Sequence, residues 1–160
     1  MRPKTLVTTV GAVFATALAG GLASRPAESM WYASLKKPSF QPPRQVFPIV
    51  WPILYADIAA VSAATLDHLH NEDRAQARTY TALLAANLAL NASWTWLFFT
   101  RRQLGLSAVA AAALTASSAD FTRRAVAARG PTAATLAAYP AWCAFATVLS
   151  TRIWQLNRTG

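Results

Sequence analysis

The chain has 160 residues, of which 54% are hydrophobic and 13% charged, and its formal net charge is +9. Soluble domains usually contain about 25% charged residues, so this composition argues against an ordinary soluble domain. The cations stand in twos and threes between apolar runs, which argues against a nucleic-acid partner, and Cys143 is the only cysteine, which excludes an intrachain disulfide.

Five apolar runs approach the length of about 20 residues that a membrane-spanning helix needs. They lie at about 5–23, 46–66, 79–100, 104–122 and 132–154. We therefore predict an all-α integral membrane protein, a bundle of five transmembrane helices that forms a single domain over residues 1–160. A soluble five-helix bundle is the alternative, because the alanine and serine content of the fourth run would also suit a buried soluble helix.

The first run, TLVTTVGAVFATALAGGLA at about 5–23, has two interpretations. Basic residues precede it and small residues end it, as in a secretory signal peptide. However, the apolar core of a signal peptide is usually about 7–15 residues long, which is shorter than this run. We therefore expect the run to be retained as the first span.

The segment 31–55 is rich in both aromatic residues and proline, with six aromatic residues and five of the nine prolines. Because proline lacks a backbone donor, KPSFQPP predicts irregular backbone at the membrane interface or over a cavity. In the second run, Phe47, Trp51 and Tyr55 repeat every four residues and share one helix face. A rigid loop that leads into an aromatic stripe predicts a lid over a pocket, and an interfacial aromatic belt is the alternative.

Other polar residues in and after the second run have simpler interpretations. Asp57 lies about 120° from the aromatic face of its helix, so we expect it to point toward another helix. The connector DHLHNEDRAQAR at 67–78 contains two histidines among acids. We favour a surface loop over a metal site, because no second pair of ligands appears elsewhere in the chain.

The third, fourth and fifth runs also carry patterned side chains. In the fourth, Asp120 precedes Arg123 and Arg124 at spacings that predict local ion pairs. The third and fifth runs each place polar and aromatic residues on one helix face: Asn87, Asn91, Trp94 and Phe98, and Tyr139, Trp142, Ala146 and Ser150. Amides in a membrane helix are costly unless they face protein, water or ligand. These stripes predict pocket walls, and helix–helix packing is the alternative.

Three motifs carry a family resemblance that covers nearly the whole chain. The first is WY-x-x-L-x-KP-x-F-x-PP followed by F-x-P-x-VW-x-x-LY. The others are L-A-LN-x-x-W-x-x-x-FF in the third run and Y-x-x-W-x-x-FA-x-x-L in the fifth. Together they resemble the TspO/MBR family, the tryptophan-rich sensory proteins and translocator proteins. The chain departs from the family's usual residues at Asn87, Trp96 and Ser150.

The resemblance implies a bundle of five transmembrane helices, usually paired as homodimers, whose long first loop caps an internal pocket. It implies that the pocket binds a porphyrin, protoporphyrin IX or haem, in a sensory, transport or scavenging role. We expect a multi-pass protein of a bacterial cell membrane, with the porphyrin as ligand and no required cofactor or metal. Carried over by motif, the ligand-binding residues are Trp31, Tyr32, Pro42, Phe47, Trp51, Asn87, Phe98, Trp142 and Ala146.

The side chains near the predicted pocket are chemically suited to a porphyrin. Aromatic walls would stack on a flat apolar macrocycle, and Lys36, Lys37 or Arg44 would meet its carboxylates at the mouth. Thr151 stands where the cholesterol motif has tyrosine, which argues against specific cholesterol binding.

Two other functions stay open. Some bacterial members of the family promote light-dependent breakdown of protoporphyrin IX, and Trp51 and Trp142 match the tryptophans tied to that photochemistry. These two residues would be catalytic if the chain has such an activity. The remaining alternative is a structural or partner-binding membrane protein with no small ligand.

Overall fold

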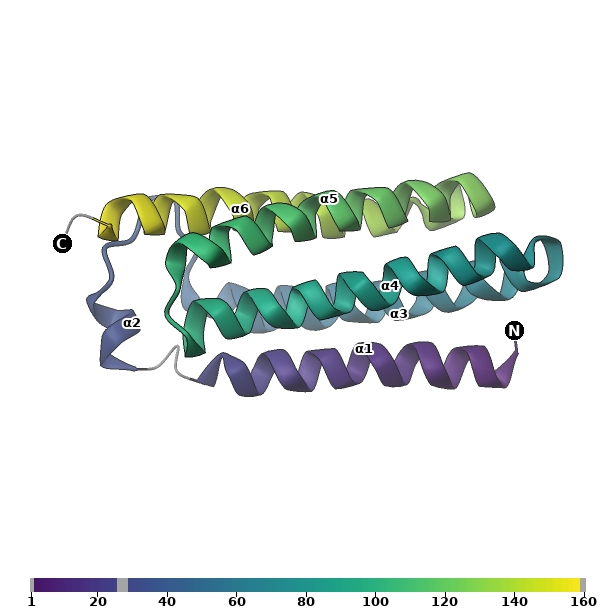
Figure 1. Cartoon of the computed structure of the whole chain (residues 1–160), viewed down its shortest axis with the longest axis horizontal. Helices are drawn as coiled ribbons and strands as arrows, with labels where there is room; N and C mark the ends of the chain where they lie inside the picture. The colour runs from purple at the N-terminus through teal and green to yellow at the C-terminus, as the bar shows by residue number, and fades with distance from the viewer. Residues whose placement is uncertain (1, 26–28, 159–160) are drawn as a thin grey trace.

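The computed structural model describes residues 2–25 and 29–158, and it confirms the all-α fold. Its long helices lie roughly parallel to one axis, and each folds back beside an earlier one (Figure 1). These helices are α1 (Pro3–Ala23), α3 (Phe47–Glu72), α4 (Arg74–Thr95), α5 (Leu104–Arg129) and α6 (Ala138–Asn157). Shorter elements join or extend them: α2 (Met30–Ser34), the 3₁₀-helices η2 (Arg44–Val46) and η4 (Gly130–Ala137), and the π-helix η3 (Trp96–Thr100).

Four stretches of the described chain are long and apolar enough to cross a membrane: Pro3–Ala23, Arg44–Glu72, Arg74–Thr100 and Leu104–Asn157. The last is 54 residues long because α5, η4 and α6 follow one another without a break. Figure 1 shows that α5 and α6 run side by side in opposite directions. The bundle therefore makes five passes, as the five apolar runs predict.

The prediction of a surface loop at 67–78 is wrong, because α3 continues to Glu72 and α4 begins at Arg74. The carboxylate of Asp73 accepts hydrogen bonds from the backbone N–H groups of Ala75 (2.9 Å) and Gln76 (3.1 Å). These amides begin a helix and have no partner within it, so the side chain caps α4. The bonds, chiefly those from Gln76, hold the pKa of Asp73 below its usual value. Polar residues here extend the helices instead of forming a loop.

The two acids inside apolar runs behave as the sequence predicts. Asp120 forms ion pairs with Arg123 (2.7 Å) and Arg124 (2.8 Å) on its own helix. The Asp57 carboxylate accepts a hydrogen bond of 2.8 Å from the hydroxyl of Thr135, which belongs to η4. Both acids therefore have partners within the bundle.

A packed core fills the space between α3, α4, α5 and η4. Its largest fully buried side chains include Tyr80, Phe121, Ile58 and Leu136. The ring centroid of Phe121 lies 6.0 Å from that of Tyr80 and 6.0 Å from that of Tyr139. A second, smaller cluster of Phe98, Leu149 and Ile153 lies near the C-terminal end of α6. The cavity described next lies beside this smaller cluster.

Candidate ligand-binding site

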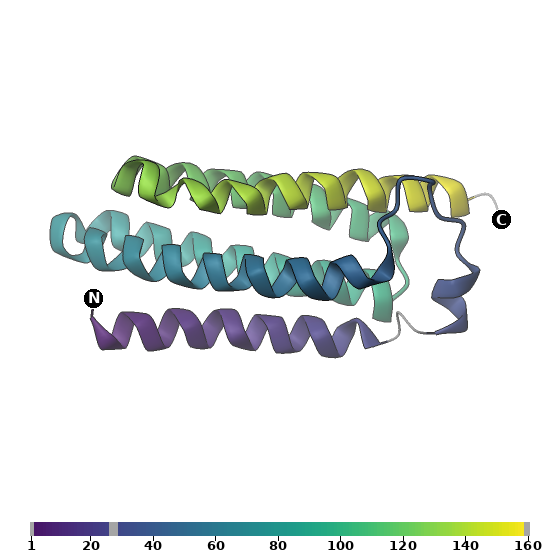
Figure 2. The same cartoon turned by 180° about the vertical axis from the view of Figure 1, so that it is seen from behind.

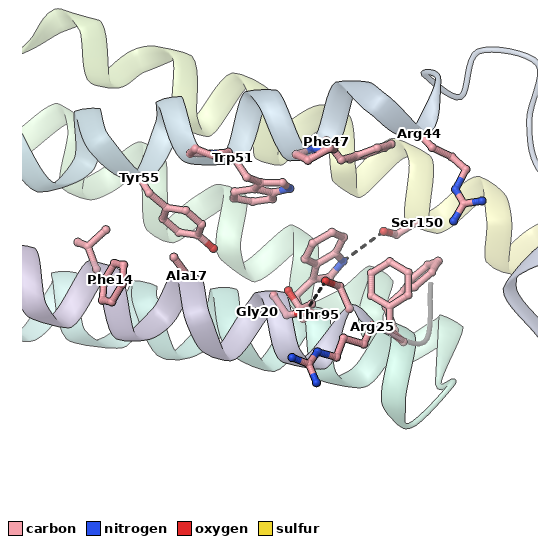
Figure 3. A pocket seen from close by; sticks show the side chains of 18 of the residues that line it. Phe14, Ala17, Gly20, Arg25, Arg44, Phe47, Trp51, Tyr55, Thr95 and Ser150 are labelled. Carbon is pink, nitrogen blue, oxygen red and sulfur yellow. Dashed lines mark hydrogen bonds between the residues drawn. The ribbon is translucent and has the colours of Figure 1, made fainter. Parts of the chain in front are cut away.

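A cavity of about 1100 Å³ opens into the bundle at the end that carries α2 and the C-terminus. Its walls come from α1, α3, the end of α4 with η3, and α6, and Tyr32 and Arg44 contribute from the connection between α1 and α3. Figure 3 shows Trp51 and Phe47 on one side and Gly20, Ala17 and Phe14 of α1 on the other. Helices from several parts of the chain therefore line one large space.

Aromatic rings form one continuous wall of this cavity. The ring of Trp51 stacks on that of Tyr55 at a centroid distance of 5.5 Å and lies 6.1 Å from the ring of Trp94. The ring of Trp94 lies 6.3 Å from that of Phe98. The predicted stripe of Phe47, Trp51 and Tyr55 lies entirely on the cavity wall. Aromatic rings in such contacts favour stacking on a further flat group.

The segment from 29 to 46, here called the cap, covers the open end of the cavity. Tyr32 of α2 reaches the wall, where its ring lies 5.6 Å from that of Phe99. Its hydroxyl accepts a hydrogen bond of 3.1 Å from the Gln41 side chain, and burial raises the pKa of that hydroxyl. The ammonium group of Lys37 lies over the same ring and donates to the carbonyl of Tyr32 at 2.6 Å. The cap is therefore a packed structure and supports the predicted lid.

One side chain ties the cap to the end of α6. The Asn157 amide accepts a hydrogen bond from the backbone N–H of Lys36 (3.0 Å) and donates one to the Lys36 carbonyl (2.9 Å). Figure 2 shows the cap passing beside this end of α6. The two bonds join residues 121 positions apart in the chain and hold the cap against the end of α6.

Replacing Asn157 with alanine should loosen the cap without unfolding the bundle. Each of the two lost hydrogen bonds is worth about 1 kcal/mol, so the cap should open roughly 30-fold more often. Hydrogen–deuterium exchange of a peptide covering 31–46 measures this opening. Gln155→Ala is the matched control, because among the described residues the Gln155 side chain bonds only Arg152, on its own helix. Equal exchange in both variants would show that Asn157 does not hold the cap.

Only some of the predicted ligand-binding residues line the cavity. Tyr32, Phe47, Trp51 and Phe98 are on its wall. The others lie elsewhere. Trp31 packs against Phe98, Pro42 is half-buried within the cap, and Ala146 is buried within the bundle. Trp142 lines a separate shallow hollow between α3 and α6, and its ring touches the ring of Phe47 from behind at 5.9 Å.

Asn87 belongs to a hydrogen-bond network behind the wall. The Tyr55 hydroxyl donates to Oδ1 of Asn91 (2.7 Å), and Nδ2 of Asn91 donates to the Tyr139 hydroxyl (3.0 Å). Tyr139 donates to Oδ1 of Asn87 (2.9 Å), and Nδ2 of Asn87 donates to Ser117 (3.2 Å). The network connects the cavity wall to α4, α6 and α5, so the two amides face protein partners as their cost in a membrane requires.

The sequence reading missed the contribution of α1. Val10, Phe14, Ala17, Gly20 and Arg25 line the cavity. The helix shows no aromatic or polar stripe, and its signal is the run of small residues ALAGG. A side-chain carbon at Gly20 would lie 3.7 Å from the Tyr55 hydroxyl, so the absence of a side chain there leaves the cavity floor open.

Comparison with known proteins identifies the same family that the sequence motifs resemble. Residues 8–155 match the model of the TspO/MBR family. The chain is 39% identical over 129 residues to the translocator protein of Ovis aries, covering 80% of this chain and 75% of that one. It is 35% identical over 153 residues to the translocator protein of Sus scrofa, covering 93% and 89%.

A bacterial relative matches over a greater length. The tryptophan-rich protein TspO of Chlorobaculum tepidum is 30% identical over 154 residues, which cover 96% of each chain. The match includes every helix that lines the cavity, and the apolar passes agree with a protein embedded in a bilayer. The chain therefore belongs to the TspO/MBR family of integral membrane proteins.

Proposed function

We propose that the protein binds a porphyrin, protoporphyrin IX or haem, inside its helix bundle, in a sensory, transport or scavenging role in a bacterial cell membrane. The observation that carries this proposal is the aromatic wall of Trp51, Tyr55, Trp94 and Phe98. A flat, apolar macrocycle gains most from a wall that is also flat and apolar. Pockets for drug-sized ligands measure about 300–1,000 Å³, so the cavity of about 1100 Å³ suits a ligand at the large end of that range.

The lining favours stacking over coordination as the mode of binding. Haem iron in proteins is usually held by histidine, cysteine or methionine, and sometimes by tyrosine. The described residues that line the cavity include none of the first three. Tyr32 and Tyr55 line it, but the Tyr55 hydroxyl is bonded to Asn91. We therefore infer that the metal-free macrocycle binds at least as tightly as haem.

Titration of the purified protein with protoporphyrin IX in the dark tests the proposal. Trp51 and Trp94 lie on the cavity wall, so a porphyrin bound there should quench their fluorescence to a saturating level at one ligand per chain. The iron complex should bind no tighter than the metal-free ring. If protoporphyrin IX causes no saturable quenching beyond that of an unrelated membrane protein, the proposal is wrong.

Light-driven degradation of the bound porphyrin is the second candidate function. The observation that favours it is the contact of Trp51 with both Tyr55 and Trp94, because indole and phenol rings are readily oxidised. In such a reaction Trp51 would give one electron to the excited porphyrin, which would pass it to dissolved dioxygen to form superoxide. The Trp51 radical would then take one electron back from the porphyrin, and superoxide would add to the oxidised ring, so that dioxygen is the net oxidant.

The same titration, repeated under light, separates binding from this chemistry. Trp51→Phe keeps a flat ring, so the dark affinity should fall by only about 0.5–1.5 kcal/mol, whereas bleaching of the porphyrin should nearly stop. Trp142→Phe should change neither quantity much, because Trp142 lies behind Phe47 and outside the cavity. A wild-type protein that binds but never speeds bleaching would exclude the second function and leave the first intact.

A further inference from the structure

We propose that Arg25 and Arg44 form an anion-binding site at the mouth of the cavity, and that the ligand is therefore an amphipathic acid with a flat apolar body. The proposal deepens the function proposed above, on which it rests for the apolar part of the ligand. It assigns the charged part of the ligand to two residues from different parts of the fold.

The two arginines lie at the same end of the cavity. Arg25 follows the C-terminal end of α1, and Arg44 is the first residue of η2, at the start of the stretch that leads into α3. Both line the cavity. Figure 3 shows Arg44 on the α3 side of the cavity and Arg25 on the α1 side. A ligand that fills the cavity would present its outer edge to both side chains.

Neither guanidinium group has a hydrogen-bond or ion-pair partner among the described residues, unlike most cations near this end of the bundle. Arg101, Arg102 and Arg158 lie over tryptophan rings at 5.1, 5.1 and 5.6 Å, respectively. Lys37 donates to backbone carbonyls of the cap, and Arg152 donates to Gln155 at 3.1 Å. The two cations on the cavity wall are therefore the ones left available to a ligand.

Among the described residues, the charges around the mouth have one sign. The acidic residues of the described chain, Asp57, Asp67, Glu72, Asp73 and Asp120, lie further along the helices from this end, and none lines the cavity. Burial and the nearby charge of Arg44 lower the pKa of Lys37 in the cap. An anion at the mouth would therefore relieve repulsion that the described side chains leave uncompensated.

The geometry of the groups favours carboxylates over a single point charge. A guanidinium group presents paired N–H donors that match the two oxygens of a carboxylate. A protoporphyrin carries its two propionate groups on one edge of the ring, so each could meet one arginine while the apolar part of the ring lies against the aromatic wall. The expected roles of Lys36 and Lys37 change accordingly, because neither lines the cavity.

Acid and ester forms of the same ligand test the proposal. The protein is placed in nanodiscs of phosphatidylcholine, whose headgroup carries no net charge. Two probe pairs are titrated in the dark: protoporphyrin IX with its dimethyl ester, and pyrenebutyrate with its methyl ester. The variants are Arg25→Gln, Arg44→Gln and the double variant. Lys36→Gln is the matched control, since it removes one charge at the same end of the bundle but outside the cavity.

We expect each single arginine variant to weaken binding of the acids about threefold to tenfold, as for a partly exposed charge pair, and to leave the esters unchanged. The double variant should bind acid and ester of a pair equally. Equal losses for acid and ester, or equal losses in Lys36→Gln, would overturn the anion site. Binding of both porphyrins without discrimination would overturn it while sparing the porphyrin function. Arginine-dependent discrimination with pyrenebutyrate alone would support the anion site and reject the porphyrin function.

Discussion

Replacing Tyr139 with phenylalanine should lower the free energy of unfolding by about 2 kcal/mol, the largest stability effect we expect from the loss of a single atom in this chain. The Tyr139 hydroxyl accepts from Asn91 (3.0 Å) and donates to Asn87 (2.9 Å) at a site with no exposed surface. Without it, one amide donor and one amide acceptor lose their partner in the middle of the bundle. Hydrogen bonds between membrane helices average only about 0.6 kcal/mol, but here two amides are left unpaired at once.

Tyr80→Phe is the matched control for this prediction. Tyr80 is equally buried and packs against the same ring of Phe121, with centroids 6.0 Å apart in both cases. Its hydroxyl shares a hydrogen bond with the Ser62 hydroxyl at 3.2 Å. Serine can turn its hydroxyl toward the backbone of its own helix, so we expect a loss below about 1 kcal/mol.

Cys143 provides the measurement. It is the only cysteine in the chain, and it is buried. A thiol-reactive fluorophore should therefore label the protein only as it unfolds, and the temperature of half-labelling reports stability. Tyr139→Phe should shift this temperature down by clearly more than Tyr80→Phe does. If the two shifts are equal, the amide network contributes no more than an ordinary buried hydroxyl.

Replacing Trp51 with alanine should weaken dark binding of protoporphyrin IX more than any other single change on the aromatic wall. Trp51 contacts both Tyr55 and Trp94, so its removal interrupts the wall at its centre. The loss combines the stacking preference with the buried apolar area of the indole, about 2 kcal/mol, which corresponds to roughly a 30-fold higher Kd.

The Trp142→Ala variant distinguishes the effect of a residue on the cavity wall from that of a residue packed behind it. The Trp142 ring contacts Phe47 at 5.9 Å from outside the cavity, so its removal should raise the Kd by less than about threefold. Titration of both variants by absorbance of the porphyrin, with the Cys143 labelling assay as a check on folding, decides the matter. A larger effect for Trp142 than for Trp51 would mean that the ligand occupies the hollow between α3 and α6.

Much of the fold and part of the site follow from the sequence alone. The five passes are encoded in the apolar runs, and Phe47, Trp51 and Tyr55 lie on the cavity wall because a spacing of four residues keeps side chains on one helix face. The cap was recognisable because proline-rich backbone and aromatic residues occur together in it. These are local patterns, and local patterns determine which side of a helix a residue faces.

Such patterns do not predict which residues along one helix face reach the cavity. Asn87 and Phe98 share a face of the same pass, but Phe98 meets the cavity and Asn87 meets Tyr139. Likewise Trp142 and Ser150 are eight residues apart, about 12 Å along α6, and only Ser150 reaches the cavity. The end of the cavity depends on how neighbouring helices approach one another, and a single helix's sequence does not specify that distance.

The wall of the cavity stops at Val10 on α1 and at Ala59, halfway along the 26-residue α3. Beyond it lies the packed core around Ile58 and Tyr80. In this conformation the cavity ends against the packed half of the bundle and does not run through it. A steady flow across the bilayer would require the packed half to separate, which would expose the amide network to lipid or water.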